Sequence, residues 1–252
     1  MVEPTDSPER SDISFGFRRV ATKEHAALVR GVFDSVADRY DLMNDLMSGG
    51  VHRLWKRALI DRLRPGTALI DVAGGTGDVA LGFMAHRDGR DATIIDANTD
   101  MLRVGRDRAM DRGLATGITF VCADAAALPL PDHGADAVTI SFGLRNVSCR
   151  TKALAEMYRV LSPGGHFLCL EFSRVVLPVF ARIYNLYSFQ IVPRLGRWVT
   201  GDEDSYRYLV ESIRAFPHQE ALSAELRDAG FGNVSHINLT GGIVALHSAW
   251  RV

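Results

Sequence analysis

Short apolar runs alternate with longer amphipathic segments through the middle of the chain. The runs that we interpret as strands are 67–72, 91–96, 118–124, 135–141 and 166–172. The segments of helical length between them are 77–88, 99–113 and 150–161. Strands that alternate with helices predict right-handed βαβ units and a mostly parallel sheet. The runs are almost continuously apolar, which is typical of strands covered by helices on both faces.

The two ends of the chain have other patterns. Apolar residues at helical spacing predict two helices within 25–64, with a break at Ser48–Gly50. Residues 174–215 have no clear strand and look helical. A last predicted helix, 218–229, precedes two apolar runs, 233–239 and 243–250. The short Thr240-Gly241-Gly242 connection between these runs predicts an antiparallel hairpin.

Length and composition indicate one globular domain of ordinary kind. The chain has 252 residues, of which 47% are hydrophobic. We expect a flexible polar tail over 1–24 and a single domain over 25–252. No apolar stretch is long enough for a signal sequence or a membrane span, so we expect a cytoplasmic protein.

Charge and cysteine content exclude several classes of function. The 29 basic and 30 acidic residues leave a net charge of −1, which gives no general case for nucleic-acid binding. The three cysteines have no CxxC spacing, which argues against a disulfide scaffold or a zinc site, and we expect no metal.

Candidate chemistry begins at the first strand–helix turn, DVAGGTGD (71–78). Its glycines let a ligand approach the backbone, and the helix that follows presents its N-terminal amides to the crevice. The second strand ends at Asp96, whose carboxylate can accept both ribose hydroxyls of an adenosine. These features suit either an NAD enzyme or an S-adenosylmethionine enzyme. The turn residues that we assign to the cofactor are Asp71, Gly74, Gly75, Thr76 and Gly77.

Two further features favour a methyltransferase over a dehydrogenase. Asp124, after the third strand, can accept a hydrogen bond from an adenine amino group. Seven strands of which the last is antiparallel are the plan of the class I S-adenosylmethionine methyltransferases, whereas an NAD domain more often continues with a sixth parallel strand. The sequence therefore predicts an α/β, Rossmann-like class I fold, with lid helices over 25–64 and a helical insertion over 174–215.

The chain closely resembles the UbiE/COQ5 family of quinone-biosynthesis C-methyltransferases from about residue 32 to residue 251. The segments most specific to that family are FDSVADRYDLMNDLMSGGVHRLWK (33–56), ISFGLRNV (140–147) and NLTGGIVALH (238–247). The family's cofactor positions fall on Thr76, Asp96, Asp124, Ala125 and Ser141. One departure is Ser148-Cys149-Arg150, where members usually carry an acidic residue and a lysine, so the capping of the next helix is in question.

The resemblance implies methylation of a ring carbon of a polyprenylated benzoquinol or naphthoquinol. A ring carbon becomes a better nucleophile when a neighbouring hydroxyl loses its proton, so the reaction needs a base and a group that stabilises a phenolate. Arg145 and Asn146 are the candidates on the phenolate side, and His52 is an alternative base. The residues that we assign to the substrate or lid are Tyr40, Asn44, Glu171, Tyr184 and Tyr187.

Residues 174–200 contain four arginines, five aromatic residues and no acidic residue. Such a stretch can lie at a bilayer surface or line a tunnel for a polyprenyl tail. The expected partners are therefore the quinol substrate and the inner face of the membrane or a quinone-biosynthesis complex, and a homodimer stays open. A core-facing helix with a solvated basic edge is the structural alternative.

Two other functions remain open from the sequence. One is an NAD-dependent oxidoreductase on a similar α/β plan. The other is a non-catalytic subunit that binds S-adenosylmethionine or quinone within a biosynthetic complex. The intact Arg145-Asn146 pair and the glycine-rich turn weigh against the second.

Overall fold

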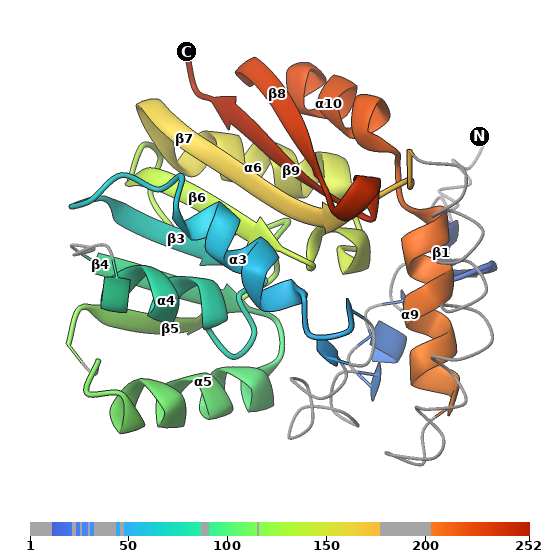
Figure 1. Cartoon of the computed structure of the whole chain (residues 1–252), viewed down its shortest axis with the longest axis horizontal. Coiled ribbons are helices and arrows are strands. Elements are labelled where there is room, and N and C mark those ends of the chain that lie inside the picture. The colour runs from blue at the N-terminus through green and yellow to red at the C-terminus, as the bar shows by residue number, and fades with distance from the viewer. Residues whose placement is uncertain are drawn as a thin grey trace, which may run out of the picture.

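The computed structural model describes residues 12–21, 24–25, 27–29, 31–32, 44–45, 48–86, 91–114, 116–176 and 203–252. Their centre is a seven-stranded sheet in the order β5-β4-β3-β6-β7-β9-β8 (Figure 1). The strands are β3 (Ala68–Val72), β4 (Asp91–Asp96), β5 (Ile118–Cys122), β6 (Ala135–Ser141), β7 (Leu161–Phe172), β8 (Gly232–Leu239) and β9 (Val244–Trp250). β9 is antiparallel to both of its neighbours, β7 and β8, and the pairs from β5 to β7 are parallel. The predicted class I sheet is confirmed.

Helices cover both faces of the sheet, which explains the almost continuous apolar runs. The helices are α3 (His52–Ile60), α4 (Asp78–His86), α5 (Thr99–Asp111), α6 (Arg150–Val160), α9 (Glu203–Ala215) and α10 (Gln219–Asp228). One core cluster joins α3, α4 and α5 to the sheet through side chains such as Leu59, Phe83 and Leu102. A second core cluster joins α6 and α10 to the opposite face through Leu154 and Leu226.

β7 begins five residues earlier than the apolar pattern predicts. Leu161 already pairs with Ala135, and the register then shifts before His166 pairs with Ala137. Within the irregular stretch, the Gly164 amide donates to the Arg251 carbonyl and the Arg251 amide donates to the Gly165 carbonyl. The end of the chain therefore holds in the sheet a segment whose own sequence resembles a turn.

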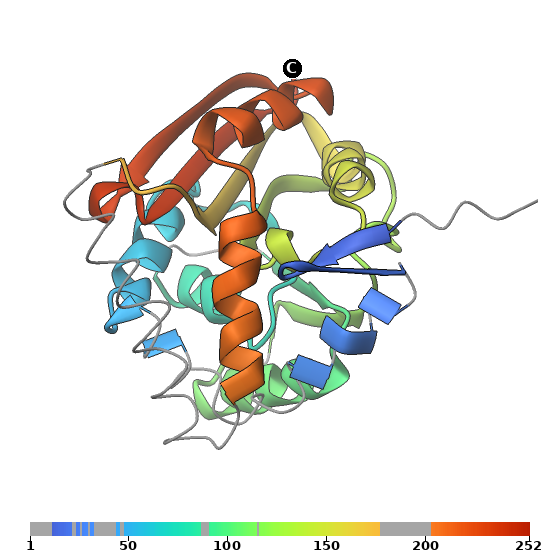
Figure 2. The ribbon, with the colours of Figure 1, turned by 90° about the vertical axis from the view of Figure 1, so that its right-hand side faces the viewer.

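The segment expected to be a flexible tail contains an antiparallel hairpin. β1 (Asp12–Phe15) pairs with β2 (Arg18–Ala21), and Gly16 between them has a φ of 61°. The Phe17 amide donates to Glu211 Oε2 of α9 at 3.1 Å. Figure 2 shows α9 crossing the carboxyl ends of the strands with this hairpin beside it. The polar composition of the first residues concealed the hairpin, because its pairing depends on a helix almost 200 positions away.

The expected helical insertion and the expected absence of a membrane span can be compared with only part of the chain. α9 falls within the predicted helical insertion, whereas residues 177–202 lie outside the described residues. None of the helices in the described ranges combines the length and the apolarity that crossing a membrane requires.

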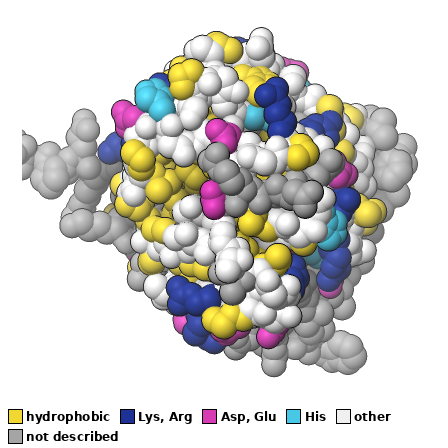
Figure 3. All heavy atoms as spheres, turned by 90° about the vertical axis from the view of Figure 1, so that its left-hand side faces the viewer, with side chains coloured by type: hydrophobic (Ala, Val, Ile, Leu, Met, Phe, Trp, Pro, Cys, Tyr) yellow, Lys and Arg dark blue, Asp and Glu magenta, His cyan; other side chains and the backbone are white. Residues whose placement is uncertain are grey.

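The face at the amino ends of the parallel strands carries basic and acidic side chains interspersed with apolar ones (Figure 3). A pocket of about 250 Å³ opens at the amino ends of β3, β6 and β7. Beside it the His166 ring stacks on Trp250 with 4.0 Å between centroids, and the Arg64 guanidinium carbon lies 4.9 Å from the centroid of the same indole. His166 is neutral at pH 7, because burial and the nearby Arg64 and Arg62 lower its pKa to about 4.

We expect His166 and His247 to lower the free energy of unfolding as the pH drops from 7.5 to 5, opposite in sign to the contribution of Asp71, whose pKa is raised to about 7. Burial lowers the pKa of both His166 and His247 to about 4. In the unfolded chain each titrates near 6.5, so below that pH the unfolded state binds more protons. At pH 5 each histidine then lowers the free energy of unfolding by about 2 kcal/mol. Urea unfolding at the two pH values measures the change. His166→Phe should reduce the pH slope and exposed His86→Gln should leave it unchanged. Equal pH slopes of the wild type and His166→Phe would contradict the assignment.

Candidate active site

The glycine-rich turn joins β3 to α4 at the carboxyl edge of the sheet. Gly75 and Gly77 have φ values of 55° and 80°, in the region that favours glycine. A Cβ on Gly75 would lie 3.0 Å from Met101 Cε, and one on Gly77 would lie 2.9 Å from Ile94 Cδ1. The turn therefore leaves room beside the Gly75 backbone only while this residue has no side chain.

A pocket of about 310 Å³ opens over this turn, across the carboxyl ends of β3, β4, β5 and β6. The predicted site residues that line it are Gly75, Asp96, Asp124, Ala125 and Asn146. They come from four different strand ends, as expected for a doubly wound α/β sheet.

Asp96 is the most firmly held carboxylate of the pocket. Its Oδ2 accepts the Gly75 amide and its Oδ1 accepts the Asn98 amide, both at 2.8 Å. Burial raises the pKa of Asp96, and these amide hydrogen bonds oppose the rise. A carboxylate can accept about four hydrogen bonds, so Asp96 keeps capacity for a diol in the pocket.

Two buried polar atoms near the turn have no hydrogen-bond partner within the described residues, Asp71 Oδ2 and Ser141 Oγ. The other oxygen of Asp71 accepts the Thr139 hydroxyl at 2.7 Å. Burial raises the pKa of Asp71 to about 7. A buried polar atom without a partner is costly, so both atoms suit a polar ligand or a water that the turn holds. Together with the space beside Gly75, they fit an adenosine cofactor with a charged tail.

Arg145 and Glu171 form a buried ion pair behind the pocket. Their side chains are 4% and 1% exposed, and Arg145 Nη1 lies 3.1 Å from Glu171 Oε2. Arg145 Nη1 also donates to the Phe142 carbonyl, and its Nε has no hydrogen-bond partner within the described residues. Burial raises the pKa of Glu171, and Arg145 opposes the rise. The pair fixes the loop after β6, η2 (Leu144–Asn146), onto the end of β7.

Asn146, the next residue along the chain, faces the pocket. Its Oδ1 accepts the hydroxyl of Tyr208 from α9 at 3.2 Å. The loop after β6 therefore places an amide in the pocket and a guanidinium behind it.

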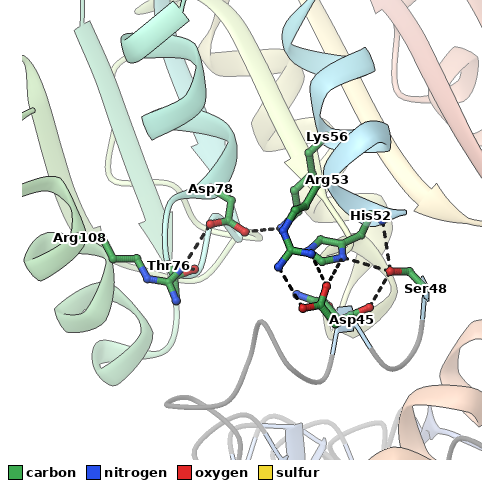
Figure 4. Close-up of polar contacts among 9 residues, drawn as sticks. Asp45, Ser48, His52, Arg53, Lys56, Thr76, Asp78 and Arg108 are labelled. Atoms are coloured by element: carbon green, nitrogen blue, oxygen red, sulfur yellow. Dashed lines mark hydrogen bonds and ion pairs between the residues drawn. The ribbon is translucent and has the colours of Figure 1, made fainter. Parts of the chain in front are cut away.

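His52 lies in a polar network on α3 and is not among the residues that line the pocket (Figure 4). His52 is 3% exposed. Its Nδ1 is 3.1 Å from Ser48 Oγ and 3.5 Å from Asp45 Oδ1. Burial, Lys56 and Arg53 lower its pKa. Its predicted role as a base stays untested, but these contacts are those of a structural residue.

The same network ties the lid helix to the glycine-rich turn. Lys56 Nζ of α3 donates to Asp78 Oδ2 at 2.7 Å, at the start of α4. Arg108 of α5 lies 3.3 Å from the other oxygen of Asp78 and donates to Thr76 Oγ1 at 3.0 Å. Burial alone would raise the pKa of Asp78, but Lys56 and Arg108 outweigh it and hold the pKa below its usual value. Thr76, assigned to the cofactor, is 1% exposed and serves this network.

The remaining predicted residues are placed only in part. Asn44 is half-buried, and its carbonyl accepts the Ser48 hydroxyl at 2.7 Å. Tyr40, Tyr184 and Tyr187 lie outside the described residues.

Sequence reasoning missed His25 and Val29, which line the pocket from the lid segment. His25 is 1% exposed. Their spacing of four residues on one helix face, within the predicted lid segment 25–64, was a usable signal.

Comparison with known proteins agrees with this geometry. A model of the ubiE/COQ5 methyltransferase family matches residues 9–251. The ubiquinone/menaquinone biosynthesis C-methyltransferase UbiE of Brucella anthropi is 55% identical over 245 residues, 95% of this chain and 93% of that protein. The protein of the same name from Methylobacterium nodulans is 54% identical over 249 residues, 97% of this chain and 98% of that protein.

Solved structures show the same fold. A SAM-dependent methyltransferase of Thermotoga maritima matches with a TM-score of 0.64 at 17% identity, over 89% of this chain and all of that one. The family and the fold confirm the predicted methyltransferase with S-adenosylmethionine as its methyl donor, rather than an NAD-dependent oxidoreductase. The chain belongs to the ubiE/COQ5 methyltransferase family.

Proposed function

We propose that the chain transfers a methyl group from S-adenosylmethionine to a ring carbon of a polyprenylated quinol, in the synthesis of ubiquinone, menaquinone or both. One observation carries the proposal. A single pocket joins two carboxylates suited to adenosine, Asp96 and Asp124, to the Asn146 amide and the Phe142 ring, where an aromatic acceptor can lie. The names of the two relatives support the quinone class of acceptor.

The residues at the first end of the pocket bind and orient the cofactor. S-adenosylmethionine supplies an electrophilic methyl group on its sulfonium. Asp96, fixed by two backbone amides, accepts the ribose hydroxyls, and the bare backbone of Gly75 permits close approach. Orientation of two bound reactants supplies about 7–11 kcal/mol of the barrier reduction in such reactions.

The residues at the second end act on the acceptor ring. Deprotonation of a ring hydroxyl moves electron density to the carbon that attacks the methyl group, and a negative oxygen develops. The Asn146 amide can donate to that oxygen. Arg145 stays charged, and its Nε can hold the water that takes the proton.

The direct test is an anaerobic assay with labelled S-adenosylmethionine and two short-tailed acceptors, a demethylmenaquinol and a 2-methoxy-6-prenyl-benzoquinol. We expect a ring-carbon product, located by mass spectrometry, and the ratio of the products assigns the acceptor. No product with intact cofactor binding would instead support the non-catalytic subunit.

The same proposal includes a peripheral contact with the inner face of the membrane, from which residues 174–200 would admit the lipid tail. The support is the composition of this segment, since most of it lies outside the described residues. We expect Arg182→Glu/Arg194→Glu to abolish flotation with anionic liposomes, because basic side chains attract anionic lipid. Arg103→Glu/Arg112→Glu on and beside α5 is the matched control. Equal flotation of the wild type and the first variant would contradict the contact.

A further inference from the structure

Tyr208 lies outside the pocket but touches a residue that lines it. The side chain projects from α9, the residue is 5% exposed, and its hydroxyl donates to Asn146 Oδ1 at 3.2 Å. The phenol also feels the charges of Arg145 and Glu171, and burial raises its pKa to about 12, so it keeps its proton at neutral pH.

This hydrogen bond decides what Asn146 can offer to a ligand. An amide side chain carries an acceptor oxygen on one side and an NH₂ donor on the other. With Oδ1 occupied by Tyr208, the NH₂ group is the part left for a bound acceptor. A donor, rather than an acceptor, is what a developing phenolate requires.

The ion pair behind the loop does not fix the amide by itself. Arg145 and Glu171 hold the backbone of η2, through the Arg145 amide and guanidinium. The Asn146 side chain can still rotate about its terminal bond, whose preference is broad. Among the described residues, the side chain that bonds to this amide is Tyr208, whose hydroxyl donates to Oδ1.

We propose that Tyr208 is a positioning residue, which holds the Asn146 amide so that its NH₂ group faces the oxygen of the methyl acceptor. The inference rests on the proposed function for the identity of that oxygen. It also gives α9, which lies within the predicted insertion 174–215, a direct role in assembling the site.

The test compares Tyr208→Phe with Tyr158→Phe, which makes the same chemical change on α6, where the ring packs edge-on against Phe231. We expect Tyr208→Phe to lower kcat about tenfold, while the KM for the quinol and the Kd for S-adenosylmethionine stay within about threefold. Tyr158→Phe should leave all three unchanged. Wild-type kcat in Tyr208→Phe would overturn the proposal.

A second comparison separates positioning from a general structural role. In an Asn146→Ala background, Tyr208→Phe should cost nothing further, because the group through which it acts is gone. A tenfold loss in both backgrounds would overturn the proposal.

A third measurement does not depend on turnover. In ¹⁵N-asparagine-labelled protein, we expect the Asn146 side-chain amide, assigned by its loss in Asn146→Ala, to relax as a more mobile group in Tyr208→Phe. If the wild type methylates no quinol, the proposed function fails, yet this readout still decides the inference. Unchanged mobility would overturn it.

Discussion

Arg145→Met is expected to unfold roughly 6–20 °C below the wild type at pH 7.5. In a chain of this size, each kcal/mol of lost stability lowers the unfolding temperature by about 2–4 °C. Arg145 and Glu171 are both almost fully buried. Removing one partner of a buried ion pair leaves an uncompensated charge and costs about 3–5 kcal/mol. Methionine keeps most of the side-chain volume, so the loss reports the charge rather than a cavity.

The pH dependence of this loss has a definite sign. Without Arg145, the pKa of folded Glu171 rises further above its unfolded value, so the folded state binds the proton more tightly. Stability is then retained at low pH and lost as the pH rises through the folded pKa. The gap to the wild type should therefore be smaller at pH 5 than at pH 7.5, followed by circular dichroism.

The double variant Arg145→Met/Glu171→Gln is the control. It removes both charges and should recover most of the lost stability. If it unfolds at the same temperature as Arg145→Met, the ion pair is not the cause. Its turnover then tests Arg145 without the folding defect. Normal turnover in a stable double variant would remove Arg145 from the reaction.

Asp96→Ala is expected to raise the Kd for S-adenosylmethionine about 100-fold, or about 2.7 kcal/mol. The substitution removes an acceptor for the ribose, and it also frees the Gly75 and Asn98 amides that the carboxylate fixes. Both losses act on the same ligand. Calorimetric titration with S-adenosylhomocysteine measures the change without catalysis.

Asp124→Ala provides the comparison for this measurement. Asp124 is exposed, and its Oδ1 accepts one backbone amide, that of Ala126. We expect Asp124→Ala to raise the Kd for the cofactor only about tenfold, because solvent competes for an exposed hydrogen bond. Equal affinities of Asp96→Ala and the wild type would show that Asp96 does not bind the cofactor.

The sheet was predictable because its signals are local. Continuous apolar runs marked the buried strands, and their carboxyl ends brought Gly75, Asp96 and Asp124 to one edge of the sheet. β7 was predicted too short because Gly164 and Gly165, which resemble a turn, bond to Arg251 more than 80 positions along the chain. The hairpin of β1 and β2 was missed for a related reason, since its contact with Glu211 spans 194 positions.

In the candidate active site too, local motifs were predictable and contacts between distant residues were not. Arg145 and Asn146 were found from one short motif. That Arg145 lies behind the pocket and Asn146 faces it could not be predicted, because these positions depend on Glu171 and Tyr208. Tyr208 is 62 positions from Asn146, and no local pattern links the two residues. His52 was proposed as an alternative base because imidazole titrates near neutrality, but its contacts with Ser48 and Asp45 could not be predicted from the sequence.

The position of β9 has a consequence for how the protein is made. This strand comes last in sequence among the seven strands of the sheet, yet it lies between β7 and β8. Arg251, which follows it, donates to the carbonyls of Tyr158, Arg159 and Leu161. While the chain is still being synthesised, β7 has an open edge and β8 has no neighbour. The sheet can close only after β9 has left the ribosome. A chain cut before β9 would therefore leave β7 and β8 with exposed edges, which marks it for aggregation or degradation.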